Sequence, residues 1–280
     1  MQILETIVDA RAVLATARSE RQRIALVPTM GNLHAGHLSL VQKARQLCDR
    51  VIVSIYVNPL QFGAGEDFAN YPRTLDADCQ QLRQAGVDWV FSPDDQGLYP
   101  AGKDQSAFIE VPGLSSILEG RSRPGHFRGV ATVVNKLFNI VQPEMAIFGE
   151  KDFQQLLVIR RMVVDLNLAV EVVGMPTLRE ADGLAMSSRN QYLSASERKQ
   201  ASTLYQVLNA TREQLLAGVT DYSRLTSEAI ETLHACGFSP DYFEIRRCDD
   251  LQLPRTPGDN KVILAAARLG RTRLIDNLPV

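Results

Sequence analysis

The sequence predicts an α/β protein: a Rossmann-like, doubly wound parallel sheet in residues 1–175, followed by a smaller C-terminal α+β domain in residues 176–280. Three observations lead to this prediction. Short apolar runs of strand length alternate with longer helical patterns in the first part, which is typical of a parallel sheet covered by crossover helices. This alternation ends at Gly174-Met175-Pro176. Two long helical patterns then precede two strand-like segments, which indicates a separate α+β unit.

The individual elements follow from the period of their apolar residues. In the first domain we expect strands at 24–28, 51–57, 89–91, 146–148 and 170–173. Helical patterns cover about 37–47, 76–85, 132–141 and 153–166. In the second domain we expect helices at about 196–217 and 221–236, and strands at 242–246 and 262–267. Ser194 or Ser196 is suited to cap the first of these helices, with Glu197 in its first turn.

The composition limits the class of protein. The 280 residues carry a net charge of -2, with 30 basic and 32 acidic side chains, which argues against a protein that coats nucleic acid or lies on an anionic membrane. Glu5 and Asp9 interrupt the N-terminal stretch where a signal peptide would need an apolar run, and no apolar run approaches the length of a membrane span. The four cysteines include no CxxC pair, which argues against a zinc site or a disulfide framework. We therefore expect a soluble, cytoplasmic protein.

The most informative segment is the loop PTMGNLHAGH, residues 28–37, between the first predicted strand and the first predicted helix. In an open parallel sheet, ligands bind at the carboxyl ends of the strands. Gly31 and Gly36 allow the backbone to turn sharply and to approach a ligand closely. The N-terminus of the following helix favours an anion, and His34 and His37 point the same way if the helix has already begun. Two imidazoles at this place suit a polyphosphate whose charge must be stabilised as a bond breaks.

Two other interpretations of the histidine pair stay open at this point. The residues could be ordinary polar loop residues or a helix cap. They could also bind zinc, but zinc needs a third protein ligand, and the other two histidines, His126 and His234, are far away in the sequence.

Two further segments strengthen the phosphate interpretation. Met186-Ser187-Ser188-Arg189 follows the last strand of the first domain, and two hydroxyls with a guanidinium can close over phosphates. FGEKDFQQ, residues 148–155, lies at another transition from strand to helix. There Lys151 supplies a point charge for a phosphate, and Asp152 stands where a helix cap or a hydroxyl acceptor would.

Six ordered motifs resemble the pantothenate synthetase family, within the nucleotidylyltransferase superfamily. They are PTMGNLHAGH, SIYVNPLQF, YPRTLDAD, RPGHFRGVATVV, FGEKDFQQL and READGLAMSSRN, and they extend from Val27 to Asn190. HxGH and MSSR are similar to the HIGH and KMSKS elements of the superfamily. VILAAARLGRTRLIDN, residues 262–277, is similar to the C-terminal end of the family, so the resemblance covers nearly the whole chain.

The resemblance implies a two-step ligase reaction. Pantoate attacks the α-phosphorus of ATP to give pantoyl adenylate and pyrophosphate, and the amine of β-alanine then displaces AMP to give pantothenate. The resemblance implies that the catalytic residues are His37, which the family labels as catalytic, His34, Lys151, Ser187, Ser188 and Arg189. The residues implied to bind ATP are Met30, Gly31, Asn32, Leu33, His34, Ala35, Gly36, His37, Gly149, Glu150, Lys151, Asp152, Leu178, Met186, Ser187, Ser188 and Arg189. Within this set Asp152 holds the ribose, and Leu178 provides a backbone contact to adenine.

The resemblance also implies how the acid, the metal and the assembly are arranged. Gln61 and Gln155 bracket pantoate, with Asn58 as an orienting partner; a glutamine can donate to a carboxylate and accept from a hydroxyl. Mg²⁺ is held mainly by ATP oxygens. Some family members have consecutive acidic residues after YPRT, whereas this chain has Asp76-Ala77-Asp78, so Asp78 is only a candidate ligand. The family implies a homodimer, and a first domain that faces the MSSR loop of the second.

Three alternative functions remain at this point. Another nucleotidylyltransferase would keep HxGH without a pocket for the acid between two glutamines. A tRNA-charging or tRNA-binding protein should show an anticodon-binding module and a basic face. A non-catalytic module would bind ATP without forming pyrophosphate.

A basic cluster precedes the helix predicted near Thr132 and consists of Arg121, Arg123, His126 and Arg128. The resemblance places this cluster near the substrate cleft, and we assign it no atomic role.

Overall fold

In the computed structural model, which describes residues 1–63 and 65–280, backbone contacts divide the chain into two units. Unit 1 comprises residues 1–150 and 158–176. Unit 2 comprises residues 151–157 and 177–280. The first part of one helix, which follows Asp152, is therefore grouped with unit 2.

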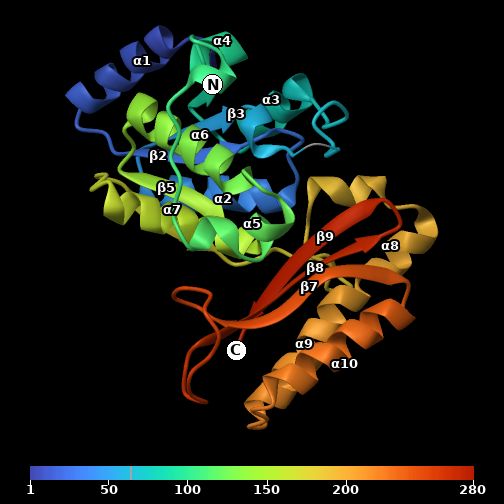
Figure 1. The fold of residues 1–280 in the computed structure, drawn as a ribbon. Helices are drawn as coiled ribbons and strands as arrows, with labels where there is room; N and C mark the ends of the chain where they lie inside the picture. Colours follow the sequence, from blue (N-terminus) through green and yellow to red (C-terminus); the bar gives the residue numbers. More distant parts are fainter. Residues whose placement is uncertain (64) are drawn as a thin grey trace. The chain divides into compact units, whose positions relative to one another are not determined.

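Six parallel strands form the sheet of unit 1, in the order β1-β4-β3-β2-β5-β6 (Figure 1). They are β1 (Gln2–Leu4), β2 (Ile24–Thr29), β3 (Arg50–Ile55), β4 (Trp89–Phe91), β5 (Met145–Gly149) and β6 (Glu171–Met175). β2 pairs with β3 on one side and with β5 on the other, so the strand order reverses at β2. The carboxyl end of β2 is therefore the switch point at which open parallel sheets bind ligands.

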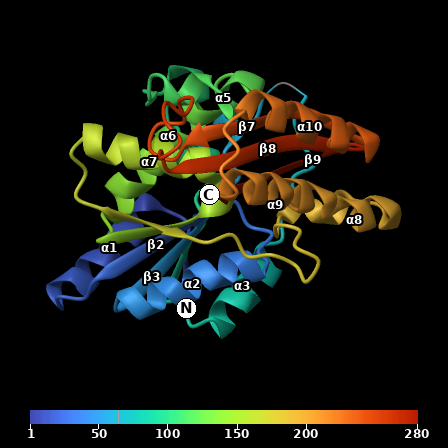
Figure 2. The ribbon, with the colours of Figure 1, turned by 90° about the horizontal axis from the view of Figure 1, so that it is seen from below.

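Helices cover both faces of this sheet, and Figure 2 shows α2 and α3 on the opposite side of β2 and β3 from α6. The helices are α1 (Ile7–Ser19), α2 (Ala35–Leu47), α3 (Leu75–Gln84), α4 (Asp95–Leu98), α5 (Glu119–Ser122), α6 (His126–Val141) and α7 (Phe153–Asp165). The short 3₁₀ turns are η1 (Pro59–Gln61), η2 (Lys103–Gln105), η3 (Leu114–Ser116) and η4 (Glu150–Asp152). Residues 24–27 of β2 are all 0% exposed, because a parallel strand is buried on both faces.

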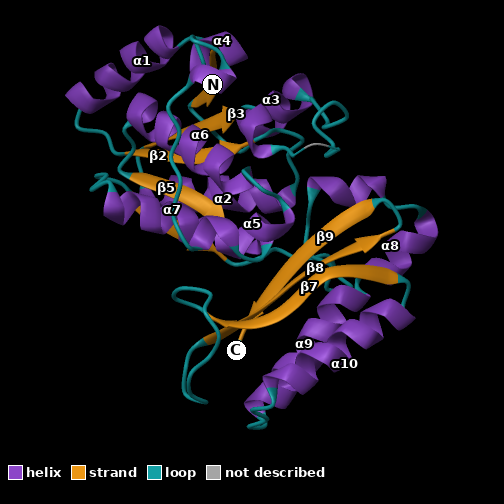
Figure 3. Ribbon diagram, in the orientation of Figure 1, coloured by secondary structure: helices purple, strands orange, loops and turns teal. Residues whose placement is uncertain are grey.

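Unit 2 is built on a three-stranded antiparallel sheet, β7-β8-β9 (Figure 3). Its elements are η5 (Ser188–Tyr192), α8 (Ala195–Ala201), α9 (Thr203–Leu216), α10 (Tyr222–Ala235), β7 (Phe238–Arg247), β8 (Lys261–Leu269) and β9 (Thr272–Pro279). Leu208 of α9, Leu233 of α10 and Ile263 of β8 are fully buried in one core, where the helices pack on one face of the sheet.

The predicted fold class is confirmed: a parallel α/β sheet is followed by a smaller α+β unit. The five predicted strands of the first domain are all present, and β1 is an additional strand. The single helix predicted at 196–217 is wrong, because the chain breaks at Ser202 into α8 and α9; Ser194 caps α8 with Glu197 in a capping box. In the part of the chain that the structure describes, no helix is long and apolar enough to cross a membrane.

The helix predicted to start near Thr132 begins six residues earlier, at His126. Gly125, with a φ of 84°, precedes it, and Gly129 lies within its second turn. Glycine is a poor helix former, which is why the pattern RPGHFRG is typical of a loop when only local propensity is considered.

Candidate active site

The loop between β2 and α2 has a strained entry that requires glycine. Gly31 has a φ of 79°, and Asn32 follows with a φ of 50°. A Cβ on Gly31 would lie 3.0 Å from Oδ2 of Asp78 and 3.1 Å from Cγ2 of Ile55. Both the left-handed backbone and the lack of space therefore favour glycine at this position.

His34 and His37 form the N-terminal cap of α2. His34 is the N-cap residue, and its Nδ1 accepts a hydrogen bond from the Gly36 N–H at 3.1 Å. Nδ1 of His37 accepts from the His34 N–H at 3.3 Å, which completes a reciprocal capping box. The two rings lie side by side, with their centroids 4.1 Å apart. The two side chains were expected to point the same way if the helix had already begun, whereas α2 begins at Ala35 and His34 is its cap.

This cap assigns a tautomer to both rings. A nitrogen that accepts a hydrogen bond carries no proton, so each neutral ring holds its proton on Nε2. Each histidine therefore presents an Nε2–H donor, beside a helix N-terminus whose backbone dipoles favour negative charge. The helix-cap interpretation and the phosphate interpretation are compatible, since the cap uses Nδ1 and an anion would use Nε2.

The carboxylate of Asp78 in α3 holds the backbone of the loop between β2 and α2. Its Oδ2 accepts from the Asn32 N–H at 2.9 Å and from the Thr74 hydroxyl at 3.1 Å, and its Oδ1 accepts from the Leu33 N–H at 2.8 Å. The residue is 1% exposed. These donors occupy the carboxylate with the loop backbone, and the prediction that Asp78 binds metal stays untested. Across residues 1–63 and 65–280, no group of three or more His, Cys, Asp or Glu side chains could hold a metal ion.

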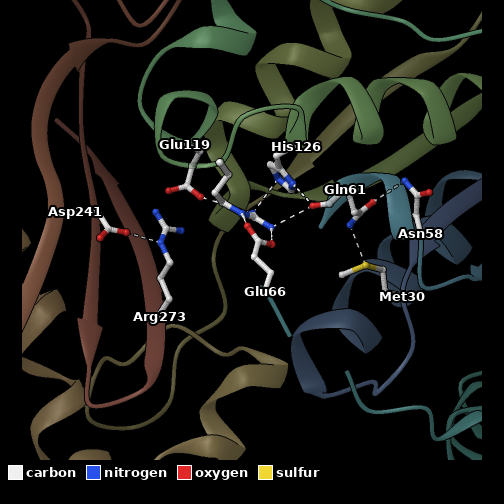
Figure 4. Close-up of polar contacts among 9 residues, drawn as sticks. Met30, Asn58, Gln61, Glu66, Glu119, His126, Asp241 and Arg273 are labelled. Carbon is white, nitrogen blue, oxygen red and sulfur yellow. Dashed lines mark hydrogen bonds and ion pairs between the residues drawn. The ribbon is translucent and has the colours of Figure 1, made fainter. Parts of the chain in front are cut away.

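The turn η1, after β3, brings together three of the predicted residues. Asn58 caps the turn and is 1% exposed; its Nδ2 donates to the Gly129 carbonyl at 3.1 Å and to Oε1 of Gln61 at 3.3 Å. Nε2 of Gln61 lies 2.9 Å from the sulfur of Met30. Figure 4 shows the Gln61 side chain directed toward Met30 and Asn58. The turn thus presents a fixed amide beside the histidine loop.

A cavity of about 430 Å³ lies in unit 1 at the carboxyl ends of β2, β3 and β4. Its size suits a small organic ligand. The residues around it are Met30, Gly31, Ile55, Tyr56, Val57, Phe68, Arg73, Thr74, Leu75, Asp78, Ser92, Pro93, Asp94 and Asp95.

The FGEKD segment spans the carboxyl end of β5 and the turn that follows it. Gly149 ends the strand and pairs with Met175 of β6, and the turn η4 spans Glu150–Asp152. Gln155 lies in the first turn of α7. In unit 2, Nδ2 of Asn277 donates to the Lys151 carbonyl at 2.9 Å, so β9 holds the backbone of this lysine.

The MSSR segment follows a narrow hairpin of unit 2. Arg179 and Ala185 form an antiparallel bridge, and the Met186 N–H donates to the Leu178 carbonyl at 3.0 Å. Ser187 caps η5, because its Oγ accepts from the Arg189 N–H at 3.2 Å. The serines and Arg189 are therefore held at the start of a 3₁₀ turn.

Two residues that support the site, Tyr99 and Gly129, were not predicted. Tyr99 donates from its hydroxyl to Oδ1 of Asn58 at 2.9 Å. Gly129 approaches η1 so closely that a Cβ there would overlap the Leu60 carbonyl. Gly129 belongs to the RPGHFRG motif, whereas Tyr99 lies outside the six family motifs.

The parallel sheet and the paired-histidine loop at its switch point define an HxGH protein of the nucleotidylyltransferase type. A family model described as pantoate–beta-alanine ligase matches residues 2–279, and the chain belongs to this family. The pantothenate synthetase of Idiomarina loihiensis is 57% identical over 281 residues, which cover 100% of this chain and 98% of the relative. That of Pseudomonas aeruginosa is 55% identical over 100% of this chain and 99% of the relative.

Solved structures agree with this membership. The crystal structure of the pantothenate synthetase of Thermus thermophilus has 47% identity and a TM-score of 0.93, with 99% of both chains covered. A pantoate–beta-alanine ligase of Francisella tularensis, described as complexed with beta-gamma ATP and beta-alanine, has 35% identity and a TM-score of 0.83. The match covers 100% of this chain and 97% of that one.

Proposed function

We propose that this protein joins pantoate to β-alanine at the expense of ATP and forms pantothenate, AMP and pyrophosphate. Membership of the pantoate–beta-alanine ligase family over residues 2–279 supports this function. The observation that carries it is the histidine pair, whose Nδ1 atoms are tied to the backbone and whose Nε2–H groups are donors at the N-terminus of α2. Such donors match the growing negative charge of a nucleotidyl transfer.

In the first step, a carboxylate oxygen of pantoate forms a bond to the α-phosphorus of ATP. The bond from that phosphorus to the bridging oxygen of pyrophosphate breaks, and pantoyl adenylate results. His37 and His34 donate from Nε2 to phosphate oxygens, which stabilises the charge without a proton transfer. The other residues of unit 1 that are proposed to line the ATP site are Met30, Gly31, Asn32, Leu33, Ala35, Gly36, Gly149 and Glu150.

The departing pyrophosphate carries several negative charges. Lys151 provides an ammonium, and Ser187, Ser188 and Arg189 provide hydroxyls and a guanidinium fork for it. Asp152 accepts from the ribose. Met186 and the backbone of Leu178 contact the adenine side of the nucleotide.

In the second step, the neutral amine of β-alanine attacks the acyl carbon of pantoyl adenylate. The new C–N bond forms as the bond to the AMP oxygen breaks, and the nitrogen releases a proton. Gln61 and Gln155 bind the hydroxy acid, and Asn58 orients Gln61 through the hydrogen bond from its Nδ2. An amide suits this task because it donates and accepts at one site.

We further propose that Mg²⁺ enters with ATP and is held mainly by phosphate oxygens, as is usual for this ion. Asp78 stays a candidate ligand, although its two oxygens already accept three hydrogen bonds from the histidine loop and Thr74, and no step is assigned to the ion. The working protein is proposed to be a cytoplasmic homodimer.

The decisive measurement is the exchange of labelled pyrophosphate into ATP in the presence of pantoate and the absence of β-alanine. We expect exchange that depends on pantoate, because adenylate formation is reversible and needs no amine. A folded protein that binds ATP but shows no exchange contradicts the proposal.

The histidine variants make the assay specific. His37→Ala removes one Nε2–H donor and is expected to lower the exchange rate by roughly 100-fold or more, the cost of losing one oxyanion donor. His234→Ala is the matched control, because His234 lies exposed near the end of α10 and should leave the rate unchanged. Pyrophosphate exchange by His37→Ala at the wild-type rate would contradict the catalytic role proposed for His37.

A further inference from the structure

The carbonyl of Gln61 is held by two side chains from the basic segment before and at the start of α6. Nδ1 of His126 lies 2.8 Å from the Gln61 carbonyl oxygen, and Nη2 of Arg123 donates to the same oxygen at 3.3 Å. Figure 4 shows His126 on the carbonyl side of Gln61, while Asn58 and Met30 lie at its amide. The backbone and the side chain of this glutamine are therefore fixed by different partners.

The tautomer of His126 follows from these contacts. A carbonyl oxygen only accepts, so Nδ1 of His126 carries the proton. Nε2 then accepts from Nη1 of Arg123 at 3.1 Å, since a guanidinium can only donate. Burial first, and the charge of Arg123 second, lower the pKa of His126 to about 4, against the opposing charges of Glu119 and Glu66. The ring is therefore neutral at ordinary pH, and its single N–H group, at Nδ1, donates to the Gln61 carbonyl.

Arg123 is itself held by carboxylates. Its Nε and Nη2 donate to the two oxygens of Glu66 at 2.7 and 2.6 Å, and Oε2 of Glu119 lies 3.8 Å from Nη1. Burial would raise the pKa of Glu66, but the hydrogen bonds and charge of Arg123 outweigh it and hold the pKa below its usual range. The fork fixes the plane of the guanidinium, and with it the direction of the bonds to His126 and Gln61.

Helix α6 contacts the same turn at a second point. A Cβ on Gly129 would overlap the Leu60 carbonyl, and the Gly129 carbonyl accepts from Nδ2 of Asn58 at 3.1 Å. This bond sets which end of the Asn58 amide faces Gln61: Nδ2 donates to Oε1 of Gln61, so Nε2 of Gln61 points toward Met30. The amide direction of Gln61 is thus determined by contacts that start on α6.

We propose that His126 and Arg123 are positioning residues for Gln61, and that they set the affinity for the acid substrate without touching it. The inference rests on the proposed function, in which the Gln61 amide binds pantoate. A small displacement of a binding group has a large effect on a substrate that it must meet at both a donor and an acceptor. If the network served stability alone, its loss would affect ATP, pantoate and β-alanine alike.

The test compares two substitutions at His126. His126→Asn keeps an N–H donor near the position of Nδ1, whereas His126→Leu fills the space without a donor. We expect His126→Leu to raise the KM for pantoate by roughly tenfold, with the KM for ATP and kcat within about twofold of wild type. His126→Asn should recover most of the wild-type KM. Arg128→Gln is the matched control, because Arg128 is exposed on the same helix and contacts the Phe108 ring, not Gln61.

Glu66→Gln provides a second variant in case His126→Leu does not fold. Glu66 is partly exposed, so its substitution is less disruptive, and it removes the carboxylate that holds Arg123. We expect the KM for pantoate to rise by about threefold, with no comparable rise in the KM for ATP or β-alanine. An equal rise in the KM for all three substrates, or no change in a folded variant, overturns the positioning role. Pyrophosphate exchange by the wild-type protein is measured in parallel. Its absence contradicts the proposed function, whereas its presence with unchanged pantoate KM contradicts only this inference.

Discussion

Asp276 of β9 binds the guanidinium of Arg179 with both carboxylate oxygens. Nη1 and Nη2 of Arg179 donate to Oδ2 and Oδ1 at 2.6 and 3.0 Å, and the guanidinium also lies 4.0 Å from the centre of the Tyr205 ring. The next residue, Asn277, donates to the Lys151 carbonyl. Two consecutive residues of one strand therefore hold both the hairpin before MSSR and the backbone of the proposed phosphate lysine.

Asp276→Ala should destabilise unit 2 strongly. It leaves a mostly buried guanidinium, with 17% of its side chain exposed, without its carboxylate partner, and breaking such a pair costs about 3 kcal/mol. Far-UV circular dichroism during denaturation measures this loss. Trp89, the only tryptophan, lies in β4 and reports on unit 1 by its fluorescence, which should change little.

Asp182→Ala is the matched control for this prediction. It removes the partner of Arg198 in the same unit, but that pair is 40% and 36% exposed. Solvent screens exposed pairs, so the expected loss is below about 1 kcal/mol. Equal losses for the two variants would show that the Arg179–Asp276 pair has no special role.

Asp78→Asn should loosen the histidine loop. An asparagine can accept from only one of the two N–H groups of Asn32 and Leu33, and its own NH₂ faces the other. We expect a loss of about 2 kcal/mol, followed by Trp89 fluorescence, and a reduced exchange rate. Asp76→Asn, an exposed neighbour in the first turn of α3, should change neither quantity.

The same variant tests the metal prediction. If Asp78 supports only the loop, the magnesium concentration for half-maximal exchange stays at its wild-type value while stability falls. An unchanged stability with a higher magnesium requirement would instead identify Asp78 as a metal ligand.

The sequence was most informative where local chemistry decides the structure. β2 and β3 were predicted because buried parallel strands are continuous apolar runs. β9 was not, because Asp276 and Asn277 interrupt its pattern with polar residues whose partners, Arg179 and Lys151, are distant in the chain. The helix break at Ser202 was not predicted either, because the apolar pattern continues across it from α8 into α9.

The candidate site likewise combines local features, which the sequence predicted, with contacts between distant residues, which it did not. The histidine loop was recognised because its glycines and its place after a strand are local features. The support by Asp78 and the Arg123–Glu66 fork join residues 45 to 57 positions apart, and no single-sequence pattern encodes such a pairing. The basic cluster therefore received a role only when the contacts to Gln61 were known.

Gly129→Ala should move η1. The added methyl group would overlap the Leu60 carbonyl, which belongs to backbone and cannot swing away as a side chain could. Overpacking of this kind costs about 1–3 kcal/mol, and we also expect a higher KM for pantoate. Gly258→Ala is the control, because its nearest neighbour would be the Thr256 hydroxyl at 4.0 Å. A wild-type pantoate KM in a folded Gly129→Ala variant would contradict the proposed contact of α6 with the turn.

The buried His126 should make stability fall as the pH is lowered. Its pKa is about 4 in the folded protein, against an ordinary value of 6.5, because burial and Arg123 disfavour the charged ring. Between these two values the unfolded chain binds a proton that the folded chain does not. The free energy of unfolding therefore decreases as the pH falls from 6.5 toward 4, by at most about 1 kcal/mol per pH unit from this group.

His126→Asn removes this contribution while it keeps the donor to Gln61. Denaturation followed by Trp89 fluorescence at about pH 7.5, 6.5, 5.5 and 5 should give a flatter stability profile for the variant than for wild type. Other groups titrate in both proteins and cancel in the difference, and the low pKa of Glu66 affects stability mainly below its unfolded value of 4.5. His234→Asn, at an exposed histidine, should leave the profile unchanged. Parallel profiles for His126→Asn and wild type would mean that the His126 ring titrates alike in the folded and unfolded chains, so that its pKa is not lowered on folding. Such a ring would be protonated below about pH 6.5 and could not then accept the hydrogen bond from Arg123.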